Sequence, residues 1–151
     1  MATTTSKVRE VLVALRDQLR LREGLADVNV FALPVKADDL GREYIVLATE
    51  ITGEQSYPFT NATTKHETVS ITGELSSVIP GAGDEVALDV MDRAMEILGE
   101  IEACLREDPR ISDTAVLAEL AEYTHATGVS EVGRVHVITF VIRAQMRLVS
   151  S

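Results

Sequence analysis

The opening third of the chain changes from a helical to an alternating hydrophobic pattern. Across residues 8–19, apolar residues recur every three or four positions, which predicts an amphipathic helix with one buried face. Ser6 is expected to cap this helix and Gly24 to end it. Residues 28–33 and 44–51 are rich in β-branched and aromatic residues, so they predict two short strands joined by a polar turn.

The middle of the chain contains a long polar stretch, one strand and one long helix. Residues 53–65 are predicted to form a loop, and loops of this length are uncommon in compact domains. Tyr57 and Phe59 within it indicate either a contact surface for a partner or a loop folded over its own core. Residues 68–78 alternate as in a half-buried strand. A Pro-Gly-Ala-Gly turn then leads into a predicted helix over residues 84–108.

Residues 113–128 form the one segment with conflicting signals. Their Ala, Leu and Glu content slightly favours a helix. The run from Tyr123 to Thr127 favours extended structure instead. Local propensity alone therefore predicts a helix by a small margin, followed by a turn over residues 128–133.

Residues 134–149 carry the strongest strand pattern of the chain. One face is continuously apolar apart from a histidine: His136, Ile138, Phe140, Ile142, Ala144, Met146 and Leu148. The opposite face begins with apolar residues and ends with basic ones: Val135, Val137, Val141, Arg143 and Arg147. A strand that is apolar on both faces is covered on both sides, so we expect the helices on one face and a partner subunit on the other. The two arginines either dock an acidic neighbour or form an ordinary strand edge.

Composition limits the class of protein. The 151 residues are 46% hydrophobic and 25% charged, as in a globular protein, and they predict a single domain spanning 1–151. The net charge of −10 disfavours binding to nucleic-acid grooves and to anionic membranes. The start of the chain lacks the apolar core of a signal peptide, and no apolar run approaches the length of a membrane helix. We therefore expect a soluble protein made in a cytoplasm.

Candidate chemistry is sparse. The turn at 80–83 precedes a helix, but two acidic residues follow it where a phosphate loop has Lys and Ser or Thr. His125 and His136 flank one turn and could face each other across a hairpin, whereas His66 is remote from both, and metal sites need three or four ligands. Cys104 is predicted to be a buried small residue. We expect no catalytic residue, no metal and no cofactor.

Taken together, the order of the elements resembles the tail terminator (tail completion) proteins of long-tailed bacteriophages. The resemblance spans nearly the whole chain but contains no sharp motif. Three stretches carry it: residues 8–15 (VREVLVAL), residues 67–74 (ETVSITGE) continuing through 80–83 into the helix at 86–105, and residues 108–113 (DPRISD) leading to the strand at 135–149.

This resemblance implies an α+β fold with a mixed or antiparallel five-stranded sheet flanked by two α-helices, in the order α-β-β-β-α-β-β. It also implies that residues 116–124 form a strand against their local propensity. Proteins of this family assemble as a hexameric ring on the last ring of the tail tube protein. They end tube growth and provide the surface that meets head-completion or neck proteins. The location implied is the head-proximal end of the virion tail, assembled in the host bacterial cytoplasm, with DNA passing through the lumen only as cargo.

Other functions remain open from the sequence. A neck or head-closure connector of the virion can share this ring-forming architecture. From a different class, the chain could be a small enzyme or ligand-binding domain with its site between the sheet and the long helix. A dimeric α+β interaction module is a third alternative.

Overall fold

The computed structural model describes residues 6–56 and 64–149 of the chain. It contains five strands, three α-helices and a short 3₁₀ turn at Glu23–Leu25. The α-helices and strands are α1 (Val8–Arg20), β1 (Asn29–Phe31), α2 (Ala37–Leu40), β2 (Tyr44–Ser56), β3 (Thr64–Ile79), α3 (Asp84–Glu107), β4 (Leu117–Val129) and β5 (Arg134–Val149).

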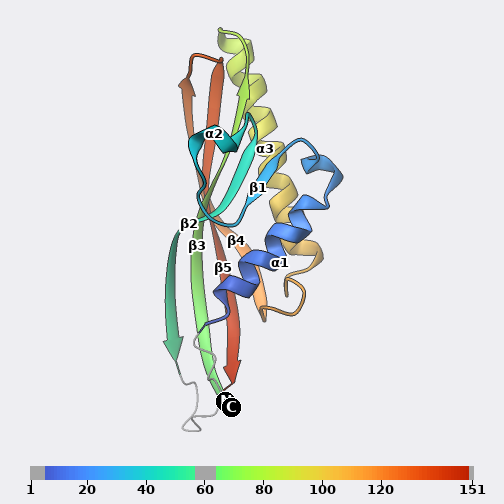
Figure 1. The fold of residues 1–151 in the computed structure, drawn as a ribbon, viewed down its shortest axis with the longest axis vertical. Coiled ribbons are helices and arrows are strands. Elements are labelled where there is room, and N and C mark those ends of the chain that lie inside the picture. The colour runs from blue at the N-terminus through green and yellow to red at the C-terminus, as the bar shows by residue number, and fades with distance from the viewer. Residues whose placement is uncertain (1–5, 57–63, 150–151) are drawn as a thin grey trace.

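The strands form one mixed sheet in the order β1-β2-β3-β5-β4. β1 runs parallel to β2, and the other neighbouring pairs are antiparallel. Both long helices, α1 and α3, lie on the same side of this sheet (Figure 1). The predicted α+β class and five-stranded sheet are confirmed. The single turn α2 adds a third helix within the segment that was expected to be a turn.

The hydrophobic core lies between the two long helices and one face of the sheet. α1 contributes Val11, Leu12, Leu15 and Leu19, and the largest fully buried side chain is Phe140 of β5. The predicted apolar face of β5 is confirmed, since its residues from His136 to Leu148 are at most 4% exposed. Each large apolar side chain buried here contributes about 1.5–3 kcal/mol, so this layer is the main source of stability.

The predicted loop over residues 53–65 is wrong at its described ends, residues 53–56 and 64–65, which belong to strands. β2 continues to Ser56 and β3 begins at Thr64, with partners such as Gly53 opposite Val69 and Gln55 opposite Glu67. Backbone pairing needs no apolar side chains, so a polar segment extends the hairpin where the hydrophobic pattern had ended. Tyr57 and Phe59 lie outside the described residues.

The helix that local propensity favours over 113–128 is also wrong, and the strand implied by the resemblance is present as β4. Every residue of β4 except Ala121 has a partner opposite it on β5. Ala118 is 3% exposed and Leu120 packs against the core. Pairing with β5 and burial beneath α3 therefore outweigh the helix propensity of Ala, Leu and Glu.

The ends of α1 differ in detail from the prediction. Lys7 is the N-cap, while the Ser6 hydroxyl accepts a hydrogen bond from the Val8 N–H at 3.3 Å. The helix ends at Arg20, and Gly24 lies in the following 3₁₀ turn. A Cβ at Gly24 would lie 2.5 Å from a carboxylate oxygen of Glu100, so this glycine permits close approach to α3 rather than ending α1.

Polar contacts hold the helices against the sheet, and two of them involve carboxylates that are buried or half-buried. Glu67 of β3 is 4% exposed and accepts hydrogen bonds from the Ser6 hydroxyl (2.9 Å) and the Lys7 N–H (3.4 Å) at the start of α1. Arg93 of α3 donates to both carboxylate oxygens of Glu43, at 2.7 and 3.0 Å. Burial alone would raise the pKa of Glu43, but hydrogen bonds from Arg93 and Ser77 lower it below its usual value.

Candidate functional site: the open face and the edges of the sheet

The face of β5 turned away from the helices carries the residues that the sequence indicated as an interface. Val135, Val137 and Val141 are half-buried, and Arg143 and Arg147 are exposed. Both α1 and α3 lie on the other side of the sheet (Figure 1), so neither long helix covers these five residues. The expected cover by the domain's own helices is therefore present on one face only. Cover of the second face by a partner subunit remains a prediction.

Neighbouring strands divide this open face into an apolar and a charged part. In the apolar part, Val135 lies between Val78 of β3 and Gly128 of β4, and Val137 lies between Ser76 and Ala126. In the charged part, Val141 lies between Thr72 of β3 and Glu122 of β4. Arg143 lies between Ser70 of β3 and Glu119 of β4, and Arg147 lies opposite His66 of β3. Hence apolar and charged contacts are available at different heights of one continuous surface.

The two edges of the sheet are free over long stretches. β1 pairs with residues 44–46 of β2, and among residues 6–56 and 64–149 the only strand beside residues 50–54 of β2 is β3. β4 is the last strand on the opposite edge, where the Ala118 N–H donates to the Pro109 carbonyl at 2.7 Å. Beyond Ala118, no further backbone partner occurs on that edge among residues 6–56 and 64–149. Unpaired edges of this length are templates for pairing with another chain.

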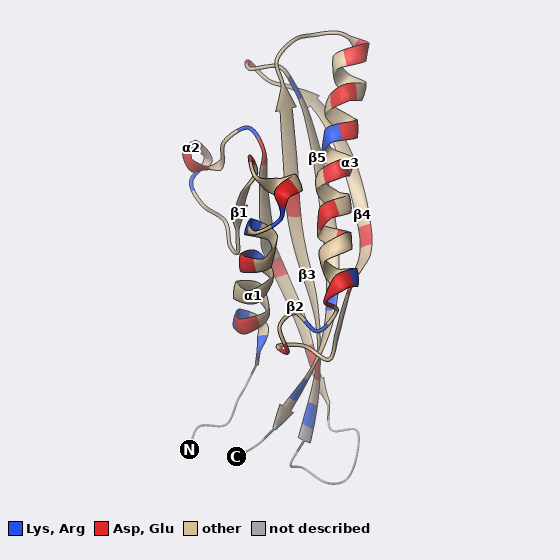
Figure 2. Ribbon diagram, turned by 90° about the vertical axis from the view of Figure 1, so that its right-hand side faces the viewer, with Lys and Arg blue, Asp and Glu red and all other residues tan. Residues whose placement is uncertain are grey.

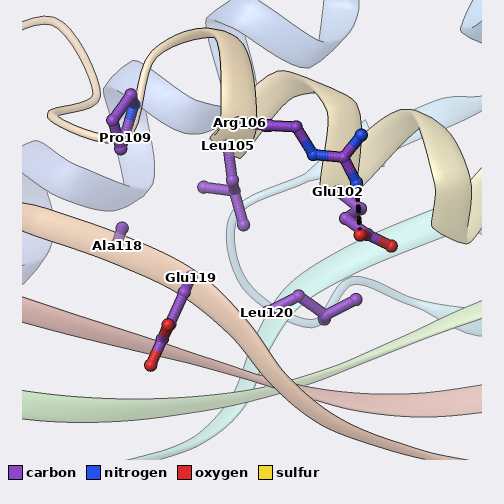
Figure 3. A pocket seen from close by; sticks show the side chains of 7 residues that line it. All are labelled: Glu102, Leu105, Arg106, Pro109, Ala118, Glu119 and Leu120. Atoms are coloured by element: carbon purple, nitrogen blue, oxygen red, sulfur yellow. Dashed lines mark hydrogen bonds and ion pairs between the residues drawn. The ribbon is translucent and has the colours of Figure 1, made fainter.

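A groove of 350 Å³ separates α3 from β4 (Figure 3). Leu105 of α3 faces Ala118 and Leu120 of β4, whereas Glu119 points away from the groove. The polar side chains on the helix side, Glu102 and Arg106, form an ion pair with each other. The lining therefore consists of apolar side chains and one ion pair whose charges cancel. Such a lining suits packing against another chain and lacks converging catalytic groups.

A second hollow, of 560 Å³, is basic although the chain as a whole is acidic. Lys7, Arg110 and Arg147 line it together with one carboxylate, Asp113. Arg110 and Asp113 are 3.4 Å apart, and both side chains are largely exposed. This site has no signature in the sequence because its cations come from three segments that only the fold brings together: the start of α1, the turn after α3, and β5.

His125 and His136 do face each other across the β4–β5 hairpin, as the sequence suggested. His125 Nδ1 lies 2.7 Å from His136 Nε2, and the rings meet edge to face. His136 is 4% exposed, and its Nδ1 is buried without a partner among the described residues. Burial lowers the pKa of His136 below its usual range, and the neighbouring His125 lowers it further. No group of three or more metal-binding side chains occurs within the part of the chain that the structure describes.

Cys104 is buried within α3, as predicted for a small apolar residue. Its thiol donates to the Gln18 side-chain oxygen of α1 at 3.4 Å. Burial raises the pKa of Cys104, which disfavours the reactive thiolate. Among the described helices, none has both the length and the apolar composition needed to span a membrane.

Comparisons with known proteins leave the family of this chain open. No protein-family model matches the chain, and no curated protein matches it either. Among solved structures, the chain is similar to a chain of the virion of a native gene transfer agent particle. The two are 17% identical, the similarity covers 93% of this chain and 94% of that chain, and the TM-score is 0.48. At this level the similarity does not by itself assign a function.

Proposed function

We propose that the chain is a non-enzymatic structural protein of a phage-like virion that forms a ring, most simply a hexamer, capping the tail tube. In this role the ring ends tube growth and presents a surface to a head-completion or neck protein. One observation carries the proposal: a five-stranded sheet has one face without a covering long helix, with Val135, Val137 and Val141 half-buried on it. Such a surface is suited to contact with other protein subunits.

The free edges of the sheet support a ring rather than an isolated dimer. A ring forms when one surface of a subunit contacts a different surface of the next and the rotation closes. β4 and residues 50–54 of β2 form opposite edges of the sheet, and the two edges differ in sequence. They provide two distinct surfaces of this kind.

The charge distribution is consistent with DNA as a passenger. The chain carries 24 acidic and 14 basic residues, and acidic bands repeat along α3 (Figure 2). A lumen of the same sign as DNA provides few phosphate contacts and lets DNA slide.

A neck or head-closure connector is the nearest alternative and would use the same open face. The enzyme or ligand-binding alternative receives less support. The groove between α3 and β4 lies where such a site was expected, but its polar residues, Glu102 and Arg106, neutralise each other.

Native mass spectrometry combined with negative-stain electron microscopy tests the proposal. Six copies of the 16.4 kDa chain have a mass of about 98 kDa, and the particle should show a central opening. Val137→Asp should abolish this species because it places a charge on the contact face. Leu21→Asp is the matched control, since Leu21 is 85% exposed next to the end of α1 and lies away from the open face.

Thermal melting of both variants separates assembly from folding. A Val137→Asp protein that melts like Leu21→Asp but stays monomeric supports the open face as the interface. A Val137→Asp protein that still assembles fully would contradict it. A wild-type chain that remains monomeric at every concentration and on purified tail tubes would contradict the ring.

A further inference from the structure

The basic hollow and the free edge of β2 lie at opposite edges of the sheet. The hollow is basic, whereas the exposed side chains Glu50 and Glu54 of β2 are acidic. We infer that Glu54 of one subunit docks against Arg147 of the next, with Arg110 and Lys7 in the same basic hollow, as a charged contact between neighbouring copies. This inference rests on the proposed ring and names the residues that would join its subunits.

The basic side of this contact is built at a break in the sheet. β4 begins opposite Gln145, so within the described residues β5 is the edge strand at Arg147, and the strand partner of Arg147 there is His66 of β3. The turn after α3 brings Arg110 to the same hollow. Arg143, four residues earlier on the same face, differs because Glu119 of β4 lies opposite it. Arg147 is therefore the exposed arginine of this face that has no described strand beside it on the β4 side.

The acidic side is the exposed part of β2. Glu50 and Glu54 are exposed, lie on the open face, and form no ion pair with the described residues. Within the described part of the chain, no second strand lies beside residues 50–54 of this strand. A carboxylate here can meet a guanidinium without first breaking an existing pair.

The two sides lie at nearly the same height of the sheet. Glu54 is opposite Thr68, Thr68 is opposite Gln145, and Arg147 follows two residues later on the same face. In a ring whose axis runs roughly along the strands, neighbouring subunits meet at equal height. The free edge of β2 in one copy then faces the basic end of β5 in the next.

Charge favours a second copy over a polyanion as the occupant. Asp113 lies in the hollow and repels phosphate. A protein partner tolerates this carboxylate because the contact can place carboxylates and arginines of both copies in alternation. The net charge of −10 also opposes association with DNA. Two copies with this charge repel each other, so their contact needs ion pairs between carboxylates of one copy and arginines of the other.

Charge reversal on each side, and on both together, tests the contact. Arg147→Glu and Glu54→Arg should each weaken self-association on the order of tenfold or more, measured by mass photometry across protein concentration. The double variant Glu54→Arg with Arg147→Glu should recover most of the loss because the pair is restored with inverted sign. Arg42→Glu, exposed at the far end of β2, is the control for net charge and should change association little.

The outcomes separate this contact from the ring itself. Rings that form equally well in both single variants overturn the contact while the proposed function stands. Single variants that fail without recovery in the double variant also overturn it. A wild-type chain that does not self-associate overturns both. If short duplex DNA binds the wild type and Arg147→Glu abolishes that binding without changing self-association, the hollow is a phosphate site and the contact is overturned.

Discussion

Replacing Gly73 with alanine should strongly destabilise the fold, although it adds a single methyl group. Gly73 lies in the middle of β3, opposite Phe140 of β5. On its other side, β2 is irregular: Val46 pairs with Glu74 and Glu50 with Thr72, so three residues of β2 lie against Gly73 alone. The extra residues bring the β2 backbone onto the Cα of Gly73.

The magnitude follows from the space available. A Cβ at position 73 would lie 2.4 Å from the Leu47 carbonyl oxygen and 2.5 Å from the Val46 carbonyl oxygen. Carbon and carbonyl oxygen normally stay at least roughly 3.3 Å apart, so both contacts overlap by nearly 1 Å. Both oxygens belong to the backbone, so no side-chain rotation relieves them. Overpacking of this kind costs about 3 kcal/mol or more, which is a large part of the roughly 5–15 kcal/mol that stabilises a typical domain.

Thermal unfolding followed by circular dichroism checks this prediction. A loss of about 3 kcal/mol lowers the Tm of a domain of this size by roughly 6–12 °C. Gly53→Ala is the matched control in the same hairpin, because the nearest atom to its Cβ would be a Val69 methyl at 3.8 Å, an ordinary contact. A Gly73→Ala protein that melts within 2 °C or so of Gly53→Ala would show that the irregularity in β2 does not press on Gly73.

Three further changes probe other parts of the fold. Glu67→Ala removes the buried acceptor at the start of α1 and should cost about 1–3 kcal/mol in urea unfolding; an unchanged midpoint would exclude that role. Asp113 has φ 63° in a left-handed turn, so Asp113→Gly should raise the Tm by a few degrees, about 1 kcal/mol, whereas Asp113→Ala should not. Because the pKa of His136 is lowered in the folded state, the unfolded chain binds more protons as pH falls through about 6.5. Unfolding free energy should therefore be constant above that range and decrease below it, and His136→Gln should flatten this decrease between pH 7.5 and 5.5, as urea titrations at each pH would reveal.

Periodicity predicted those parts of the fold in which a single face is buried. α1, α3 and β5 all have an apolar stripe of the correct period, and their buried residues agree with it. Where burial does not decide the conformation, the hydrophobic pattern did not predict the strands. The polar ends of β2 and β3 are strands because their backbones pair, and β4 is a strand because β5 and α3 are next to it.

The candidate site divides in the same way. The open-face residues Val135 to Arg147 could be read from alternation along one strand. The basic hollow could not, because Lys7, Arg110 and Arg147 are far apart in sequence and no local pattern relates them. The close approach at Gly73 was likewise invisible, since it depends on an irregularity in a different strand.

The position of β5 in the sheet has a consequence for biosynthesis. β5 follows every other described element in the chain, yet it lies between β3 and β4 and carries Phe140, the largest fully buried side chain. Until residues 134–149 have left the ribosome, β4 has no partner and α3 lacks much of the surface it covers. The nascent chain therefore cannot complete its core stepwise from the N-terminus, and folding must wait for long-range pairing, which is intrinsically slow. If the proposed ring forms, its subunits would become competent to assemble only after β5 has been synthesised.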